Sequence, residues 1–194
     1  MAAATRRCWV LTAFISGAIV AFVGCGHSGK PAATSATTTP PHGSWSRPAA
    51  PPDPHTLLRA GAAAVAAVPN GTLIFVRSQE SGTWRVLVAT PDGTTQSMDV
   101  SSDGVTVMVG PTPKNESDAD KTQNRARVQA ARVDYRAAVD KILATVRDAS
   151  VTELNLGDSN GTPVWEADVW DYYIVEHKVT INAASGDLIA NKQV

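Results

Sequence analysis

The chain ends in TINAASGDLIANKQV, residues 180–194, and the same order of features occurs once before, in SMDVSSDGVTVMVG, residues 97–110. Each stretch has an alternating apolar segment, then small and polar residues, a glycine and a second apolar segment. This pattern is typical of two β-strands joined by a turn in which glycine adopts a positive φ. We therefore expect two hairpins, with Gly104 and Gly186 as their structural turn glycines.

The segment before the first hairpin predicts a helix and further strands. Asp53 and Pro54 are typical of a helix start, because an aspartate caps free N–H groups and a proline at the first position has none to leave unpaired. An alanine-rich segment follows and ends at Pro69-Asn70-Gly71. Short apolar segments separated by turn residues come next and predict four strands, at residues 72–78, 83–90, 94–100 and 105–109.

A helix followed by four strands is predicted a second time. Ser117 and Asp120 have the spacing of a capping box, and apolar residues then recur every three or four positions as far as Val146. This pattern predicts one long amphipathic helix. Four more strands are expected after it, at residues 151–157, 163–170, 172–182 and 187–192.

The predicted fold class is α+β, with two repeats of one helix packed on a four-stranded antiparallel sheet. The first repeat, residues 54–110, is degenerate, and a linker at residues 111–117 joins it to the second, residues 118–194. An alignment of the two halves places Trp84 on Trp165, and both indoles are expected in the core. The pattern leaves open whether the two repeats share one sheet.

The first 24 residues have the composition of an export signal peptide. Arg6 and Arg7 precede an uncharged run that ends at Gly24 and is short for a membrane span. The next residue is Cys25, and the sequence Phe-Val-Gly-Cys resembles the lipobox of bacterial lipoproteins, in which the cysteine is acylated. We expect Cys25 to anchor the chain on the extracytoplasmic face of the cell membrane. An uncleaved anchor, a plain secretory peptide and twin-arginine export remain alternatives.

Residues 25–53 are rich in Pro, Thr and Ala and predict a disordered tether, because almost nothing in them is large enough to bury. The two cysteines of the chain, Cys8 and Cys25, both precede the predicted body, which therefore has no disulfide and no cysteine nucleophile. The chain has 17 Lys and Arg against 18 Asp and Glu, and this balance argues against nucleic acid as a partner.

Motifs of the common metallohydrolases and of nucleotide-binding enzymes are missing from the sequence. The four histidines form no H-E-x-x-H pair, and no glycine-rich phosphate loop occurs. His177 alternates with apolar residues and is expected to be a histidine at the edge of the core. We expect a protein that is not an enzyme and that needs no cofactor or metal.

The second half carries a resemblance to a known family. The sequences VTELNLGDSNGTPVWEADVWD, residues 151–171, and HKVTINAASGDLI, residues 177–189, resemble a PepSY domain. This module occurs in propeptides of thermolysin-like metallopeptidases and in many exported bacterial proteins and lipoproteins. Asn182 stands where the family typically has an aspartate, and Gly186 closes the turn. The resemblance implies a binding or inhibitory role toward an extracytoplasmic peptidase, or a sensory one, with no catalytic residues.

Candidate partner-binding residues lie on and beside the predicted strand 163–170. Alternation places Trp165, Ala167 and Val169 on the core face and leaves an indole among carboxylates on the other face, a composition found at interface hot spots. Paired acids of a glycoside hydrolase, or a Trp170 packed under a helix or loop, are the competing interpretations of that second face. The partner-binding candidates are Glu166, Asp168, Trp170, Tyr172 and Glu176.

Together these features predict a lipid-anchored binding protein of the cell envelope that modulates or inhibits an extracytoplasmic peptidase. The alternative is a structural or carrier lipoprotein that encloses an apolar ligand. A carrier requires a sizeable cavity between helix and sheet, whereas a binding module requires a packed core and an exposed aromatic patch.

Overall fold

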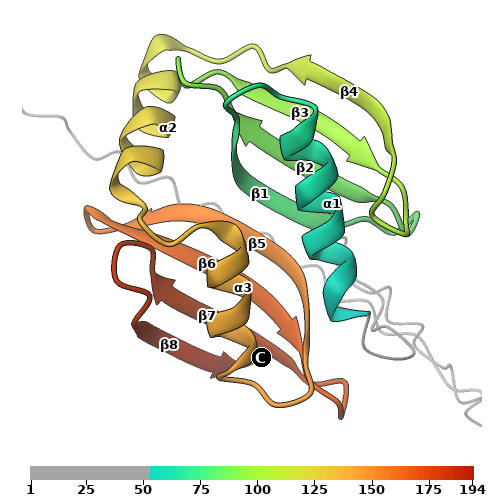
Figure 1. Ribbon diagram of the computed structural model, residues 1–194. Coiled ribbons are helices and arrows are strands. Elements are labelled where there is room, and N and C mark those ends of the chain that lie inside the picture. The colour runs from blue at the N-terminus through green and yellow to red at the C-terminus, as the bar shows by residue number, and fades with distance from the viewer. Residues whose placement is uncertain (1–52) are drawn as a thin grey trace, which may run out of the picture. The chain divides into compact units, whose positions relative to one another are not determined.

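The computed structural model describes residues 53–194 (Figure 1). The predicted signal peptide, the predicted lipidation site Cys25 and all of the predicted tether except Asp53 lie outside the described residues. Within residues 53–194, no helix combines the length and the apolar composition that a membrane span requires.

The described part of the chain contains three helices and eight strands. The strands form a single antiparallel sheet in the order β4-β3-β2-β1-β5-β6-β7-β8. The elements are α1 (Pro54–Ala66), β1 (Thr72–Ser78), β2 (Trp84–Ala89), β3 (Thr95–Val100), β4 (Val107–Pro113), α2 (Asp118–Ala130), α3 (Tyr135–Leu143), β5 (Ser150–Ser159), β6 (Thr162–Trp170), β7 (Glu176–Asn182) and β8 (Leu188–Gln193).

The two four-stranded sheets that the sequence suggested are joined into one. β1 and β5 pair antiparallel, with Phe75 opposite Asn155, and this contact unites β1–β4 with β5–β8. Each half alone would expose an unpaired strand edge at β1 or β5, and the pairing satisfies the backbone groups of both. The fold is therefore α+β, as expected, with one eight-stranded sheet.

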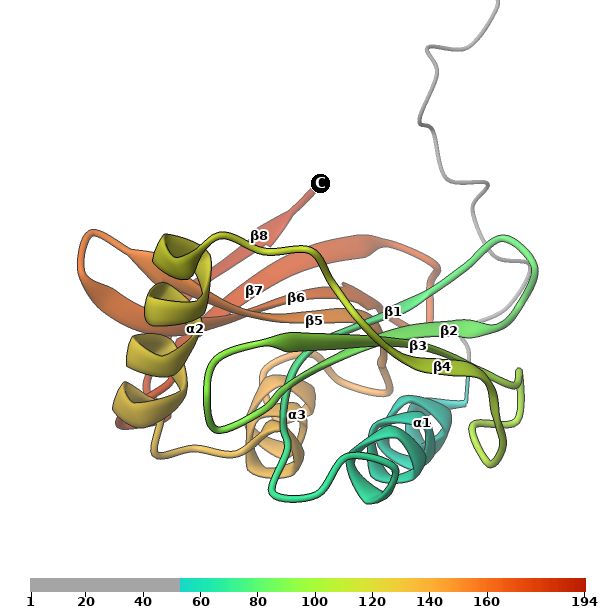
Figure 2. The ribbon, with the colours of Figure 1, turned by 90° about the horizontal axis from the view of Figure 1, so that it is seen from above.

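Helices α1 and α3 lie on the same side of the sheet, and α2 runs along one end of the strands (Figure 2). The core fills the space between the sheet and these two helices, and both Trp84 and Trp165 are buried in it, as predicted. Small residues let α1 approach closely: a Cβ atom at Gly61 would lie 2.8 Å from the ring of Tyr135. We call the opposite side of the sheet the open face.

The prediction of one long helix after residue 117 is wrong. The capping box of Ser117 and Asp120 starts α2 as expected, but the backbone is extended at Ala131 and a new helix, α3, starts at the N-cap Asp134. The apolar stripe continues across the break, which is why periodicity alone did not reveal it. Tertiary contacts hold the break: the N–H groups of Arg132 and Val133 both donate to the carbonyl of Ala183 at 2.9 Å.

Two strand ends differ from the prediction by four residues, and the other ends by two residues or fewer. β4 continues to Pro113, so residues 111–113 pair with β3 where a linker was expected. β7 starts at Glu176, because residues 172–175, where strand was expected, belong to a turn that begins at Asp171. The turn glycines Gly104 and Gly186 have φ values of +76° and +82°.

Candidate binding surface

The side chains of strand β6 alternate between the core and the open face. Trp165, Ala167 and Val169 are 1%, 3% and 0% exposed and belong to the core. Glu166, Asp168 and Trp170 point the other way, because successive side chains of a strand alternate between its two faces. The structure thus places three of the candidate residues together on the open face.

Two of these candidates are tied to the neighbouring strands by polar contacts. The Lys178 ammonium donates to Asp168 at 2.7 Å and lies 4.0 Å from Glu176, so one lysine serves two of the predicted carboxylates. The hydrogen bond to Asp168 raises the pKa of Lys178 above its usual value. Glu166 is exposed and accepts from the Asn155 amide at 3.4 Å.

Trp170 is half-buried on the open face, with Ser150 and Glu176 as its cross-strand neighbours. It is therefore neither a core residue like Trp165 nor a freely projecting one. Glu176 is half-buried as well. The indole and this carboxylate lie at the end of the open face where β6 ends and β7 begins.

That turn, residues 171–175, presents two tyrosines to solvent. Tyr172 and Tyr173 are 69% and 76% exposed, and their rings meet edge to face with centroids 5.5 Å apart. Asp171 holds the turn: one carboxylate oxygen accepts from the backbone N–H groups of Tyr173 and Val175, each at 2.9 Å. The bond from Val175 is the main cause that lowers the pKa of Asp171. We call residues 171–175 the aromatic turn.

The backbone of the aromatic turn adopts a conformation that its sequence disfavours. Ile174 has φ +59°, which a β-branched residue rarely adopts, and its N–H donates to the carbonyl of Asp171 at 3.0 Å. Sequence reasoning found Tyr172 but missed Tyr173, because an extended strand would have put the two side chains on opposite faces. The aspartate before the pair was the available sign of a turn, since its side chain readily caps nearby N–H groups.

His177 lies on the core side of β7, at its edge. Its Nδ1 is 3.2 Å from Asn191 Oδ1 and its Nε2 is 3.4 Å from Asp171 Oδ2. The ring thereby connects the aromatic turn to β8. Among the described residues, no group of three or more His, Cys, Asp and Glu side chains is arranged to hold a metal ion.

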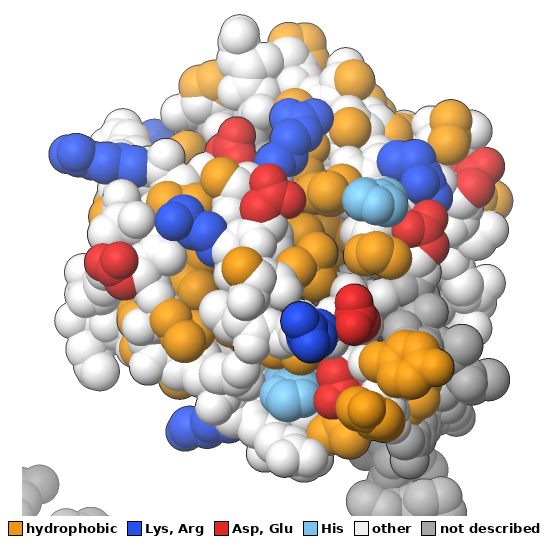
Figure 3. Space-filling model, turned by 60° about the horizontal axis from the view of Figure 1, so that its bottom comes forward, with side chains coloured by type: hydrophobic (Ala, Val, Ile, Leu, Met, Phe, Trp, Pro, Cys, Tyr) orange, Lys and Arg blue, Asp and Glu red, His pale blue; other side chains and the backbone are white. Residues whose placement is uncertain are grey.

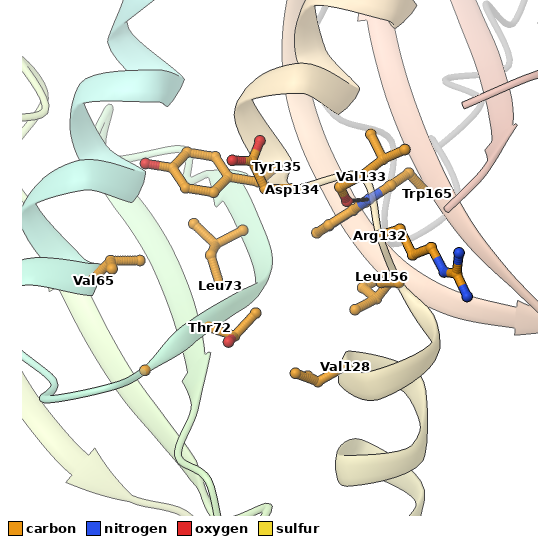
Figure 4. A pocket seen from close by; sticks show the side chains of 12 residues that line it. Val65, Thr72, Leu73, Val128, Arg132, Val133, Asp134, Tyr135, Leu156 and Trp165 are labelled. Atoms are coloured by element: carbon orange, nitrogen blue, oxygen red, sulfur yellow. Dashed lines mark hydrogen bonds between the residues drawn. The ribbon is translucent and has the colours of Figure 1, made fainter. Parts of the chain in front are cut away.

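A pocket of about 290 Å³ lies on the helix side, where the connection between α2 and α3 meets the sheet (Figure 4). Leu73 and Tyr135 line it from one side, and Val128, Leu156 and Trp165 from the other. Ligand pockets usually measure about 300–1,000 Å³. This volume lies just below that range, so this pocket is not the sizeable cavity that a carrier requires.

Charge is mixed on the surface drawn in Figure 3. Acidic and basic side chains are interspersed with hydrophobic ones there, and neither sign forms a continuous area. Large exposed hydrophobic side chains in the described part occur in the aromatic turn, around the two outer strands β4 and β8, and at the carboxyl end of the chain. They are Val105, Met108, Val109, Tyr172, Tyr173, Leu188, Ile189 and Val194.

Comparisons with known proteins give limited similarity. A scan against models of protein families finds no match, and a search of curated proteins finds none either. Among solved structures, the chain is similar to the crystal structure of a candidate lipoprotein from Clostridium difficile 630, with 10% sequence identity and a TM-score of 0.43. The matched region covers 65% of this chain and 84% of that one.

Proposed function

We propose that the chain is a lipid-anchored binding protein of the bacterial cell envelope, built from two PepSY-like repeats, that acts without catalysis by holding or restraining an extracytoplasmic peptidase. The observation that carries the proposal is the aromatic turn, where Tyr172 and Tyr173 project side by side from a backbone fixed by Asp171. Aromatic side chains held in place lose little entropy on binding and dominate the energetics of many interfaces.

The surroundings of the turn support this role. Trp170 and Glu176 lie at the adjoining end of the open face, so three aromatic side chains and a carboxylate belong to the same end of the sheet. The core beneath is filled by buried side chains from both halves. A packed core with an exposed aromatic patch favours a binding module, and a pocket of about 290 Å³ disfavours the carrier alternative.

The sheet topology supports the two repeats. Each half consists of helical structure followed by four strands, and in each half the strands run outward in chain order from the centre, β1 to β4 on one side and β5 to β8 on the other. A duplicated unit joined through its first strand would have this arrangement. The lipid anchor rests on the sequence around Cys25 alone.

A photoreactive residue at position 172 tests the proposed surface in living cells. We expect it to capture an envelope peptidase, whose activity the purified protein then lowers. The matched control is a photoreactive residue at position 159, the exposed last residue of β5 at the other end of the strands, which should not capture that peptidase. Capture of lipid alone, or equal capture at both positions, would contradict the proposal.

The anchor is tested separately with Cys25→Ala. The unmodified protein is expected in the detergent-soluble membrane fraction and the variant in the supernatant. A variant that stays in the membrane fraction would rule out lipidation at Cys25 as the anchor.

A further inference from the structure

One continuous row of charged side chains crosses the open face from β3 to β8. Each member lies directly opposite the next on the neighbouring strand, so all seven share one face and one height along the strands. In spatial order the row is Asp99, Arg85, Arg77, Glu153, Asp168, Lys178 and Lys192. We call these seven residues the charged row.

Like charges are neighbours at two places in the middle of the charged row. Arg77 lies opposite Arg85, and Glu153 lies opposite Asp168. Like charges placed directly opposite each other destabilise an antiparallel pair. Ion pairs offset this cost in part: Arg85 contacts Asp99 at 2.5 Å, Arg77 contacts Glu153, and Lys178 contacts Asp168.

The result is an exposed positive patch beside a partly exposed negative patch. The side chains of Arg77 and Arg85 are 40% and 44% exposed, and those of Glu153 and Asp168 are 18% and 27% exposed. The boundary between the patches coincides with the boundary between β1 and β5, which is the centre of the eight-stranded sheet.

A two-fold rotation makes this surface complementary to itself. Consider an axis parallel to the strands that lies above the open face, between β1 and β5. The rotation reverses the strand order of the second copy. A residue of one copy therefore faces the residue of the second copy that lies at the same distance from the β1–β5 boundary, on the opposite side of it. Arg77 then faces Glu153 of the second copy, Arg85 faces its Asp168, and Asp99 faces its Lys178. Each of these three contacts joins opposite charges, and the seventh member, Lys192, faces Val109 of β4.

We propose that the chain forms a symmetric homodimer in which the open faces of two copies stack across the charged row. The partner is a second copy because a two-fold interface must be complementary to itself, and this row is. The positive patch of each copy then neutralises the negative patch of the other. The interface also covers Phe75 and Leu87, half-buried apolar side chains in the adjacent row of the open face.

The direction of the axis is compatible with attachment to one membrane. Rotation about an axis parallel to the strands keeps the direction of every strand, so the start of α1 at Asp53 lies at the same height in both copies. Two tethers can then reach the same surface. The aromatic turns stay at the ends of the stacked sheets, so dimerisation does not depend on the proposed binding of a peptidase.

Charge reversal with complementation tests the dimer in the full chain carrying Cys25→Ala. Sedimentation of that chain should show a concentration-dependent dimer, weakened at about 1 M salt, where screening acts over about 3 Å. Arg85→Asp and Asp168→Arg should each raise the dissociation constant of the dimer by about tenfold or more. The contact between positions 85 and 168 occurs twice in the symmetric dimer, and each variant puts two like charges there. An equimolar mixture of the two variants should dimerise again, since every altered contact then joins opposite charges.

A crosslinking pair keeps the test decisive if a charge variant is unstable. In the dimer, Ser97 of one copy is expected to face Thr180 of the other. Within a single copy the two residues are far apart, because Ser97 is on β3, Thr180 is on β7, and four strands lie between them. In a background carrying Cys8→Ala and Cys25→Ala, the double variant Ser97→Cys/Thr180→Cys should give covalent dimers with a bismaleimide of about 10 Å, the spacing of stacked sheets. Ser97→Cys alone should not.

Three results would overturn the proposal. The first is a monomer at all accessible concentrations. The second is a dimer that neither charge reversal weakens, because it must use another surface. The third is equal crosslinking of the single and the double cysteine variants.

Discussion

The indole Nε1 of Trp165 donates a 2.8 Å hydrogen bond to the backbone carbonyl of Val133. Trp165 is 1% exposed in β6, and Val133 lies in the extended connection between α2 and α3. A core side chain of one half thus supplies the partner that this carbonyl loses when the helix is interrupted. The break between the two helices is fixed by the core, and it has consequences for stability.

Replacement of Trp165 by Phe should lower the free energy of unfolding by about 2–4 kcal/mol, because it removes buried ring volume and leaves the Val133 carbonyl without its donor. Trp84→Phe is the matched control. Trp84 is also buried, but its Nε1 has no hydrogen-bond partner among the described residues, so that variant loses volume alone. Chemical denaturation of both variants measures the difference, and an equal loss in the two would contradict the role of the bond.

The two turn glycines should differ in their tolerance of a side chain. Both have positive φ, which costs an alanine about 1 kcal/mol. A Cβ at Gly104 would also lie 2.6 Å from the Thr56 carbonyl oxygen, whereas at Gly186 it meets the flexible end of Lys141. We expect Gly104→Ala to lower the thermal midpoint clearly more than Gly186→Ala. A similar shift in both variants would show that backbone conformation alone sets the cost.

Asn124 attaches α2 to the sheet. It is 5% exposed, its amide donates to the Gly93 carbonyl and to the Thr95 hydroxyl, both at 3.1 Å, and it accepts from Arg127 at 2.9 Å. Asn124→Ala should cost about 2–3 kcal/mol because buried polar groups lose their partners. Hydrogen exchange should also show faster exchange across α2. The neighbouring exposed residue supplies the control: Gln123→Ala should change neither quantity.

The carboxyl group of Asp92 should titrate at unusually low pH. Hydrogen bonds from the hydroxyls of Thr90 and Thr94 are the main causes that lower its pKa to about 2 from the usual 3.8. Because the folded pKa is the lower one, this group stabilises the fold above pH 3.8, and the contribution is lost as the pH falls toward 2. NMR titration should give a midpoint of about 2 that rises in Thr90→Val. A midpoint of 3.8 in the unmodified chain would contradict the bonding.

The local fold could be predicted because it depends on contacts between residues close in sequence. The eight strands, the start of α1 and the capping box of α2 all follow from alternation, turn residues and caps. The interruption of the second helix was not predicted, since the groups that hold it, Trp165 and Ala183, are distant along the chain. Asp134, which caps α3, was the local sign that the periodic apolar stripe concealed.

The candidate site also has one part that the sequence predicted and one part that it did not. Alternation along β6 was enough to place Glu166, Asp168 and Trp170 on one face. The exposure of Tyr172 beside Tyr173 depends on a turn that Asp171 holds against the conformational preference of Ile174, and a strand pattern does not reveal it. The role of these residues in binding a partner stays a prediction.

The sequence by itself determined the α+β class, the eight strands and the division of each strand into a core face and an outer face, because these properties repeat with periods of two to four residues. Only the tertiary structure decided that β1 pairs with β5, and so that one sheet replaces two. The same pairing brings Arg77 next to Glu153 and makes the charged row continuous. Register between strands distant in sequence depends on which backbone edges remain unpaired once each half has folded, and no local pattern records that outcome.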